Sequence, residues 1–350
     1  MLVSVGMKSR TALVTMAAGA ALLWMQRVRR PQYWNLAGRV VLVTGGSRGL
    51  GLAVARRLVA EQARVAVCAR DRETLERARN DLDRLGGSVL AFPCDVTDRD
   101  AVSRMVQDVT DRLGNIDALI NNAGTIAVGP LESMDVDDFS RAMNVNFWGS
   151  LYTILAVLPG MRRQRSGRIV NVASIGGKIS VPHLLPYSAS KFALVGLSEG
   201  LRAELRHHGI EVTTVCPGLM RTGSPRHALF KGQHRKEYAW FSVSDSLPGL
   251  SMDADRAASE IVEALKRGYA ERILSVPARI GVKAQAIFPS LTAEMLAVAD
   301  RLLPDPTFVS ARRAVKGEAS VSGWLSSWLA RLGTRAEQRY NQVPPIDSGS

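Results

Sequence analysis

The sequence predicts an α/β fold, a doubly wound parallel sheet in a single domain with helical additions at both ends. From residue 39 to about residue 276, short and nearly continuous apolar runs alternate with longer stretches of helical spacing. Such apolar runs are typical of strands that helices cover on both faces. A glycine-rich turn joins the first apolar run to the first helix. In sheets of this kind, ligands bind beyond the carboxyl ends of the strands.

The net charge of +13 over 350 residues is unevenly distributed. Residues 1–30 carry five Lys or Arg and no acid, residues 221–240 carry five against one, and residues 310–350 carry six against three. The rest of the chain is therefore almost neutral. This distribution argues against a nucleic-acid binder, which presents one basic face. It favours contact with an anionic membrane surface.

Three cysteines, Cys68, Cys94 and Cys216, lie in or just after apolar, strand-like runs. They are odd in number and lack the spacing of metal ligands, so we expect buried thiols and no metal site. Reduced thiols favour a reducing compartment.

Residues 1–35 are expected to form a hydrophobic, anchor-like segment. Thr11 to Met25 carries no charge, and basic residues flank it on both sides. The run is shorter than the roughly 20 residues of an ordinary transmembrane helix, but snorkelling Lys and Arg and local bilayer thinning allow it to span. Tyr33 and Trp34 would then lie at the membrane interface.

Two alternatives to an uncleaved anchor stay open. Ala18-Gly19-Ala20 resembles the small-residue site of a cleaved signal peptide, and the segment could also be a soluble helix that packs on the body. More positive charge follows the segment than precedes it, which places the catalytic domain in the cytoplasm. A soluble cytoplasmic protein is the alternative localisation.

Six apolar runs read as strands and alternate with helical stretches such as Leu50–Ala60 and Ala101–Leu113. The runs are residues 40–43, 65–68, 89–92, 118–120, 169–172 and 212–215.

The glycine-rich turn after the first strand is predicted to bind the pyrophosphate of a dinucleotide. Glycines permit a tight turn and a close approach of backbone amides, and the helix N-terminus attracts the anion. The spacing is G-x-x-x-G-x-G rather than the commoner G-x-G-x-x-G. The turn reads Thr44, Gly45, Gly46, Ser47, Arg48, Gly49, Leu50 and Gly51.

The end of the second strand indicates which dinucleotide is bound. Arg70 follows this strand, and Arg48 lies in the glycine turn. Two guanidiniums suit the 2′-phosphate of NADP(H), which accepts charge-assisted hydrogen bonds, so NADP(H) is predicted over NAD(H). Asp71 argues against the prediction of NADP(H), because a carboxylate here would bind the ribose hydroxyls of NAD.

Polar residues also follow the third and fourth strands, where the cofactor is expected. Asp95 and Val96 follow the third strand, and Asn121-Asn122-Ala123-Gly124 follows the fourth. Turn chemistry alone would also explain these residue types. Asn146 lies inside a predicted helix. Asn is a modest helix former, so we expect Asn146 to serve a purpose other than the stability of that helix.

Tyr187 and Lys191 are the candidate acid–base pair. Pro186 indicates the first turn of a helix, which puts the two side chains one turn apart on the same face. An ammonium beside a phenol favours the phenolate and lowers its pKa towards neutrality.

Together these motifs resemble the short-chain dehydrogenase/reductase family over roughly residues 36–276, a Rossmann-fold catalytic domain. The matching positions are Thr44, Gly45, Gly49, Leu50, Gly51, Asp95, Asn121, Asn122, Ala123, Gly124, Asn146, Ser174, Tyr187, Lys191, Pro217, Gly218 and Thr222.

The resemblance implies a catalytic set. Ser174 would stabilise charge on a substrate carbonyl oxygen, and Tyr187 would exchange the proton. Lys191 would lower the pKa of Tyr187 and hold the nicotinamide ribose, and Asn146 would anchor a water that links Lys191 to solvent. Pro217, Gly218 and Thr222 would line the nicotinamide end. The family also implies a homodimer or homotetramer.

Two regions lie outside the matched motifs. Residues 220–250 mix basic and aromatic side chains, which suits an anionic carrier, lipid headgroups or an ordinary lid. Residues 277–350 form a C-terminal extension with a helix over Ser290–Leu303, and an amphipathic helix follows around Trp324–Leu332. That second helix would lie in a membrane interface or pack against protein. Disorder is expected from Gln342 onward.

The sequence therefore predicts a membrane-associated, NADP-dependent enzyme that interconverts a carbonyl and an alcohol on a lipophilic small molecule. One alternative is a soluble 3-oxoacyl thioester reductase whose basic loop meets an acidic carrier. Another is a non-catalytic scaffold that binds NADP.

Overall fold

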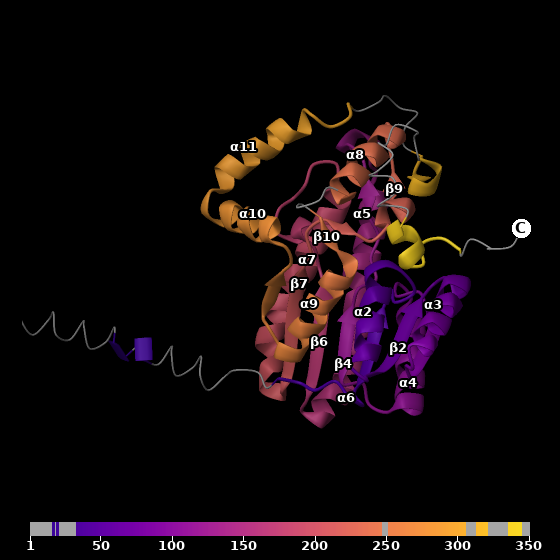
Figure 1. Ribbon diagram of the computed structural model, residues 1–350. Coiled ribbons are helices and arrows are strands. Elements are labelled where there is room, and N and C mark those ends of the chain that lie inside the picture. The colour runs from indigo at the N-terminus through magenta and orange to yellow at the C-terminus, as the bar shows by residue number, and fades with distance from the viewer. Residues whose placement is uncertain are drawn as a thin grey trace, which may run out of the picture.

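A seven-stranded parallel sheet forms the centre of the molecule, in the order β11-β7-β6-β4-β1-β2-β3 (Figure 1). The computed structural model describes residues 16–17, 19–20, 33–246, 251–305, 313–320 and 335–344. The strands are β1 (Val40–Thr44), β2 (Arg64–Ala69), β3 (Val89–Pro93), β4 (Ala118–Asn121), β6 (Gly167–Val172), β7 (Ile210–Cys216) and β11 (Glu271–Ile273). The first six confirm the predicted runs, and the fold class is confirmed with them.

Helices cover both faces of this sheet. On one face α2 (Gly49–Ala60), α3 (Arg72–Arg84) and α9 (Ala254–Arg267) share a buried apolar cluster with the strands. On the other face α4 (Arg99–Leu113), α6 (Gly149–Gln164) and α7 (Leu185–Leu205) share a second cluster. Because both faces are covered, every residue of the central strands β1, β4 and β6 is buried, which explains their largely apolar character. α5 (Val136–Met143) precedes α6 and packs on α7.

The segment that leads into β1 belongs to this core. Trp34 is buried between the guanidiniums of Arg39 and Arg168, which lie 4.0 and 4.4 Å from the ring centroid. Its backbone N–H donates to the Lys266 carbonyl at 2.8 Å. The prediction that Trp34 lies at a membrane interface is therefore wrong, because core packing and two cation–π contacts hold its ring.

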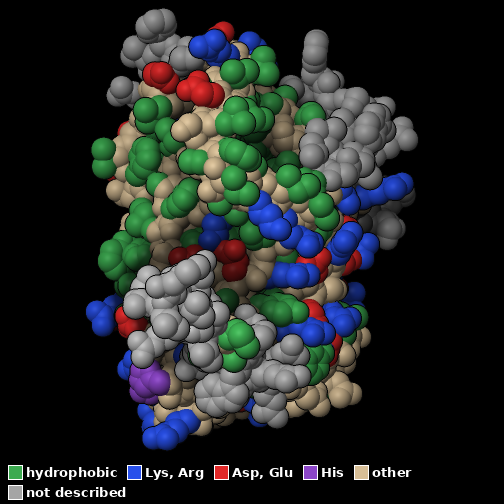
Figure 2. Space-filling model, turned by 90° about the vertical axis from the view of Figure 1, so that its left-hand side faces the viewer, with side chains coloured by type: hydrophobic (Ala, Val, Ile, Leu, Met, Phe, Trp, Pro, Cys, Tyr) green, Lys and Arg blue, Asp and Glu red, His purple; other side chains and the backbone are tan. Residues whose placement is uncertain are grey.

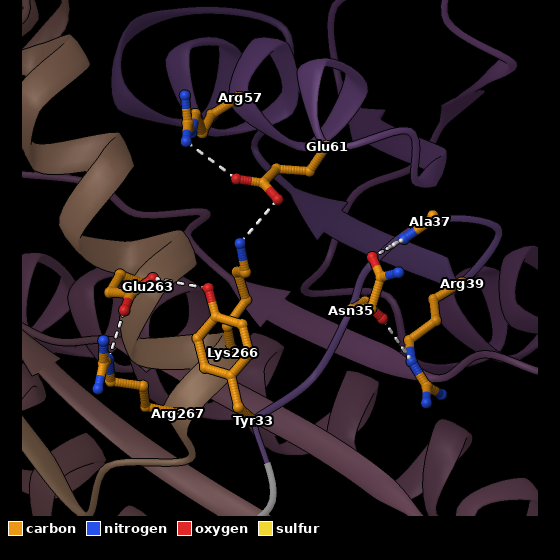
Figure 3. Close-up of polar contacts among 9 residues, drawn as sticks. All are labelled: Tyr33, Asn35, Ala37, Arg39, Arg57, Glu61, Glu263, Lys266 and Arg267. Carbon is orange, nitrogen blue, oxygen red and sulfur yellow. Dashed lines mark hydrogen bonds and ion pairs between the residues drawn. The ribbon is translucent and has the colours of Figure 1, made fainter.

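A hydrogen bond joins this entry segment to α9, and a salt bridge joins α9 to the end of α2, as Figure 3 shows. Lys266 near the end of α9 lies 2.7 Å from the Glu61 carboxylate, which also contacts Arg57 of α2 at 2.9 Å. The Tyr33 hydroxyl is 3.5 Å from a Glu263 oxygen. The hydrogen bond from Lys266 is the largest of the causes that act on the pKa of Glu61, and it lowers this pKa. These contacts fasten the start of the catalytic domain to the lower end of α9.

Above the sheet, segments far apart in the sequence combine into small sheets. β5 (Ala127–Val128), β9 (Leu229–Phe230) and β12 (Val315–Lys316) form one, and β8 (Met220–Arg221) pairs with β10 (Met252–Asp253) in another. α8 (His234–Ser246) packs on β8 and β9. The C-terminal extension thus supplies an edge strand to the region around residues 220–250.

α10 (Val276–Ile287) and α11 (Pro289–Asp300) extend away from the sheet (Figure 1). α11 confirms the helix predicted over Ser290–Leu303. The second amphipathic stretch, around Trp324–Leu332, lies outside the described residues.

The predicted membrane segment, Thr11–Met25, lies almost wholly outside the described residues. Within the ranges that the structure does describe, no helix combines the length and the apolar character needed to cross a membrane.

Candidate active site

The glycine turn lies at the carboxyl end of β1 and at the start of α2. Gly45 and Gly49 have φ angles of +64° and +58°, which other residues rarely adopt. A Cβ on Gly45 would lie 2.9 Å from the Ala123 Cα, and one on Gly51 would lie 2.1 Å from the Gly45 carbonyl oxygen. The turn is a backbone cradle next to a helix N-terminus, which fits a pyrophosphate. Gly51 does not line the cavity, so its expected cofactor contact is replaced by packing of α2 on the turn.

Asn122 holds this turn from the neighbouring strand. Its Nδ2 donates to the Thr44 and Gly45 carbonyls at 3.2 and 3.1 Å. The backbone N–H groups of Asn122 and Ala123 both donate to the Thr44 hydroxyl at 3.0 Å. The Asn122 side chain therefore shapes the cradle, and Asn122, Ala123 and Gly124 of the Asn-Asn-Ala-Gly motif line the cavity.

Arg48 and Arg70 both line the cavity. Burial, followed by the charge of Arg70, lowers the pKa of Arg48. Asp71, the residue that argued for NAD, also lines the cavity, and its Oδ1 caps α3 by accepting from the Thr74 N–H at 2.8 Å. Two cations thus lie near each other while the carboxylate next to them is used for helix capping.

Ser174, Tyr187 and Lys191 converge at the end of β6 and the first turns of α7. Burial raises the pKa of Tyr187 to about 12, partly offset by a hydrogen bond with Ser174. Burial lowers the pKa of Lys191 to about 8. Its Nζ donates to the Val172 carbonyl at 2.9 Å and lies 5.8 Å from the Tyr187 ring centroid.

The expectation that Lys191 lowers the pKa of Tyr187 is not met in this structure. The phenol is desolvated, and desolvation disfavours the charged phenolate more than its surroundings stabilise it. A phenol with a raised pKa stays protonated at neutral pH. Tyr187 is therefore held in the form that can donate a proton to a carbonyl oxygen.

Asn146 lies one layer behind these residues, on a π-helical turn over Asn144–Trp148. Its Nδ2 donates to Ser190 Oγ at 2.8 Å and to the Thr125 carbonyl at 3.1 Å. Its Oδ1 accepts from the Thr125 N–H at 2.9 Å. Isolated π-turns often occur at functional sites. Asn146 does not line the cavity and instead ties α7 to the loop after β4.

A single cavity of about 340 Å³ contains most of the predicted residues. Those that line it are Gly45, Ser47, Arg48, Gly49, Leu50, Arg70, Asp95, Val96, Asn122, Ala123, Gly124, Ser174, Tyr187, Lys191, Pro217, Gly218 and Thr222. Their distribution along one cleft, from Arg70 at one end to Tyr187 at the other, fits an extended dinucleotide with its reactive end at Tyr187.

Sequence reasoning missed Thr74, Ser224 and Gln342 among the lining residues, and it gave His227 no role. Gln342 was expected to be disordered but is buried, because it packs against the glycine turn. No local pattern signals this contact. Only the fold brings residue 342 to residue 49.

Two of the five Lys and Arg of residues 221–240 are paired with acids within the protein. Lys231 is buried and lies 3.0 Å from Asp135 and 2.5 Å from Asp138. Arg226 faces Glu337 at 3.6 Å. These partners neutralise part of the charge that was expected to meet an acidic carrier, while Arg235 and Lys236 are exposed.

Asp245 is a buried acid next to this site that the sequence did not indicate. It lies on α8, and its Oδ2 accepts from the Ser224 hydroxyl at 3.4 Å. Burial raises the pKa of Asp245 to about 7, and its charge also raises the pKa of Tyr187.

Comparison with known proteins adds to this geometry. A family model described as short chain dehydrogenase matches residues 39–229. A fatty acyl-CoA reductase from Acinetobacter baylyi is 34% identical over 300 residues, which is 85% of this chain and 94% of that protein. That alignment extends well beyond the matched family segment.

Two solved structures show the range of related proteins. An actinorhodin polyketide ketoreductase with NADPH is 33% identical, with a TM-score of 0.61 over 68% of this chain and 95% of its own. An NAD⁺-bound xylitol dehydrogenase is 29% identical, with a TM-score of 0.59 over 69% of this chain and 99% of its own. The fold of this chain is therefore similar both to a protein solved with NADPH and to one solved with NAD⁺.

Proposed function

The chain belongs to the short-chain dehydrogenase family, and from this premise we propose that it is an NADP-dependent reductase of lipophilic, long-chain carbonyl compounds. It is an oxidoreductase that acts on C=O and CH–OH groups. The observation that carries the proposal is the convergence of Ser174, Tyr187 and Lys191 at one end of a dinucleotide-shaped cleft.

The side chains present have distinct roles in this reaction. Bound nicotinamide supplies the hydride. Ser174 donates a hydrogen bond to the substrate oxygen as negative charge develops on it. Tyr187, protonated because burial raises its pKa, donates the proton that completes the alcohol. Lys191, charged below a pKa of about 8, stabilises the phenolate that is left on Tyr187 when it gives up its proton.

The experiment that tests the function is a substrate panel followed by cofactor absorbance. Long-chain aldehydes, ketones, 3-oxoacyl thioesters and saturated acyl thioesters are each offered with NADPH and with NADH. We expect turnover with NADPH and a long-chain carbonyl. The absence of turnover with every carbonyl and either cofactor would contradict an enzymatic role and favour the NADP-binding scaffold.

A long acyl chain as substrate is supported by the alignment with the fatty acyl-CoA reductase, which covers 85% of this chain and so reaches into the C-terminal extension. Likeness to a polyketide ketoreductase favours a second candidate, reduction of a 3-oxoacyl thioester. The two differ in the group reduced, so the panel separates them.

The preference for NADP(H) is proposed from Arg48 and Arg70. We expect Arg48→Ala or Arg70→Ala to raise the Kd of NADPH by about 10- to 100-fold, because each removes a charge-assisted hydrogen bond to the 2′-phosphate. The Kd of NADH, which lacks that phosphate, should stay within about twofold. Binding is measured by cofactor fluorescence. Arg163→Ala is the control, since Arg163 is exposed at the end of α6.

If the Arg variants weaken NADPH and NADH equally, the two guanidiniums do not read the 2′-phosphate. A wild-type protein that binds NADH more tightly than NADPH would overturn the NADP assignment itself.

Membrane association is also proposed, with a lipid bilayer as the surface that α10 and α11 meet. Figure 2 shows hydrophobic side chains gathered over the upper part of the face where these helices lie. Both charged side chains of α10, Arg279 and Lys283, are basic, as anionic headgroups require. The uncharged run Thr11–Met25 supports the same surface. The apolar residues, each more than half exposed, are Val276, Ile280, Ile287, Phe288, Leu291, Met295, Val298 and Leu302.

Removing residues 1–30 is expected to lower the fraction of protein that sediments with anionic vesicles. In that shortened chain, Leu291→Glu should reduce the remaining vesicle binding by about tenfold, because a buried leucine contributes roughly 1.5–3 kcal/mol. Leu85→Glu is the matched control, since Leu291 and Leu85 are 59% and 56% exposed but lie on different elements. Equal loss in both variants would argue against a lipid-contacting face on α11.

A further inference from the structure

The C-terminal segment 335–344 lies directly against the glycine turn, although the turn comes nearly three hundred positions earlier in the chain. The Tyr340 carbonyl accepts from the Gly49 N–H at 2.9 Å. Asn341 Nδ2 donates to the Ser47 carbonyl at 2.7 Å and to the Thr74 carbonyl at 2.9 Å. One short segment therefore bridges the turn and the start of α3, the two elements that border the cofactor cleft. In Figure 1 it is the yellow helix above α2 and α3.

This segment is a packed part of the domain. Tyr340 and Ala336 are buried in the apolar cluster that includes α2 and α9. Arg77 Nε donates to Asn341 Oδ1 at 2.9 Å, and Glu337 faces Arg226 at 3.6 Å. Asn341 adopts a φ of +56°, a conformation that Asn tolerates better than most residues. The backbone turn at Asn341 directs the next residue into the cleft.

Gln342 is that residue, and its side chain is only 7% exposed. Its Nε2 donates to the Thr222 carbonyl at 2.8 Å, and it would lie 3.1 Å from a Cβ on Gly49. Its Oε1 is buried and has no hydrogen-bond partner among the described residues. A buried amide oxygen without a donor is costly, and Gln342 is one of the residues that line the cavity, so a ligand donor that reaches Oε1 would remove this cost.

The surroundings of Gln342 limit what that donor is. The Gln342 carbonyl lies 3.2 Å from His227 Nε2, and burial lowers the pKa of His227 to about 4, so this neighbour is neutral at pH 7. A pyrophosphate has only acceptor oxygens at neutral pH and cannot satisfy Oε1. Hydroxyl groups and a carboxamide N–H can. The nicotinamide half of the dinucleotide carries both, but hydroxyl and amino groups are also present in the adenosine half. The hydrogen bond of Gln342 to Thr222, a position that the family resemblance assigns to the nicotinamide end, favours the nicotinamide half.

We propose that Gln342 binds the nicotinamide half of the cofactor through Oε1, and that segment 335–344 holds the cofactor in place. This inference rests on the proposed dinucleotide function. It assigns to the C-terminal extension a part of the cofactor site, next to the glycine turn and Thr222.

Gln342→Ala is expected to raise the Kd of NADPH by about 3- to 10-fold, the contribution of one hydrogen bond. The Kd of adenosine 2′,5′-bisphosphate, which lacks the nicotinamide half, should stay within about twofold. Asn341→Ala, which loosens the segment, should speed NADPH release in stopped-flow fluorescence. Gln338→Ala is the matched control, an exposed glutamine of the same segment. Gln342→Met, of similar volume, repeats the test should the alanine variant fail to fold.

The outcomes separate two failures. If the wild-type chain binds neither NADPH nor NADH, the proposed function fails. If the wild-type chain binds NADPH and the Gln342 variants bind it equally well, only the assignment of Gln342 is overturned. Equal weakening of NADPH and of the bisphosphate would also overturn it, since Gln342 would then act only by packing.

Discussion

Tyr187→Phe is expected to lower turnover by about 10²- to 10⁴-fold, the usual contribution of general acid–base catalysis. The change removes the only group of the phenol that can give a proton and keeps the ring that packs against Gly176. Cofactor binding should therefore change little. Turnover is measured by NADPH absorbance, and the Kd of NADPH by fluorescence.

The control for this result is Tyr269→Phe, which removes the same atom from a partly exposed tyrosine outside the cavity. Its turnover should match that of the wild type. A Tyr187→Phe enzyme that keeps more than about a tenth of wild-type turnover would refute the proton-donor role.

Asp245→Asn is expected to stabilise the protein, and more strongly at high pH. Asp245 is buried, and its pKa is raised from 3.8 to about 7. The unfolded chain therefore ionises at lower pH than the folded protein does. The stability that the protonated Asp245 carboxyl provides is fully present below pH 3.8 and is lost as the pH rises through 7. Ionisation of this buried group lowers the free energy of unfolding by up to about 4 kcal/mol.

Urea unfolding at two pH values checks this prediction. Between pH 5.5 and 8.5 the stability gained by the Asn variant over the wild type should grow by about 2 kcal/mol. Asp108→Asn, on the exposed side of α4, should show no such growth. A gain that is independent of pH would mean that Asp245 does not titrate in this range.

The strands and the glycine turn could be predicted because their causes are local. A strand covered on both faces is apolar at nearly every position, as in β1 and β4, where only the last residues, Thr44 and Asn121, are polar. Gly45 needs a left-handed φ, and Gly51 has no room for a side chain. The one-turn spacing of Tyr187 and Lys191 on α7 follows from helix geometry alone.

The electrostatics of the site could not be predicted in the same way. Sequence proximity indicated that Lys191 lowers the pKa of Tyr187, but burial raises it to about 12. Likewise the sequence places Lys231 in a segment of basic and aromatic residues, and only the fold shows that it is buried beside Asp135 and Asp138. Desolvation depends on every element packed around a group, so the neighbours in sequence do not reveal it.

The sequence by itself predicted the sheet and the cradle after β1, because strand burial and glycine conformation act over a few residues, and the family resemblance supplied the set of Ser174, Tyr187 and Lys191. Only the tertiary structure decided that Asp71 caps α3, that Trp34 lies in the core, and that Gln342 enters the cofactor cleft. Such contacts join residues up to about 290 positions apart, as between Gly49 and Tyr340. They exist only after the sheet and its helices have packed, since packing alone brings those surfaces together.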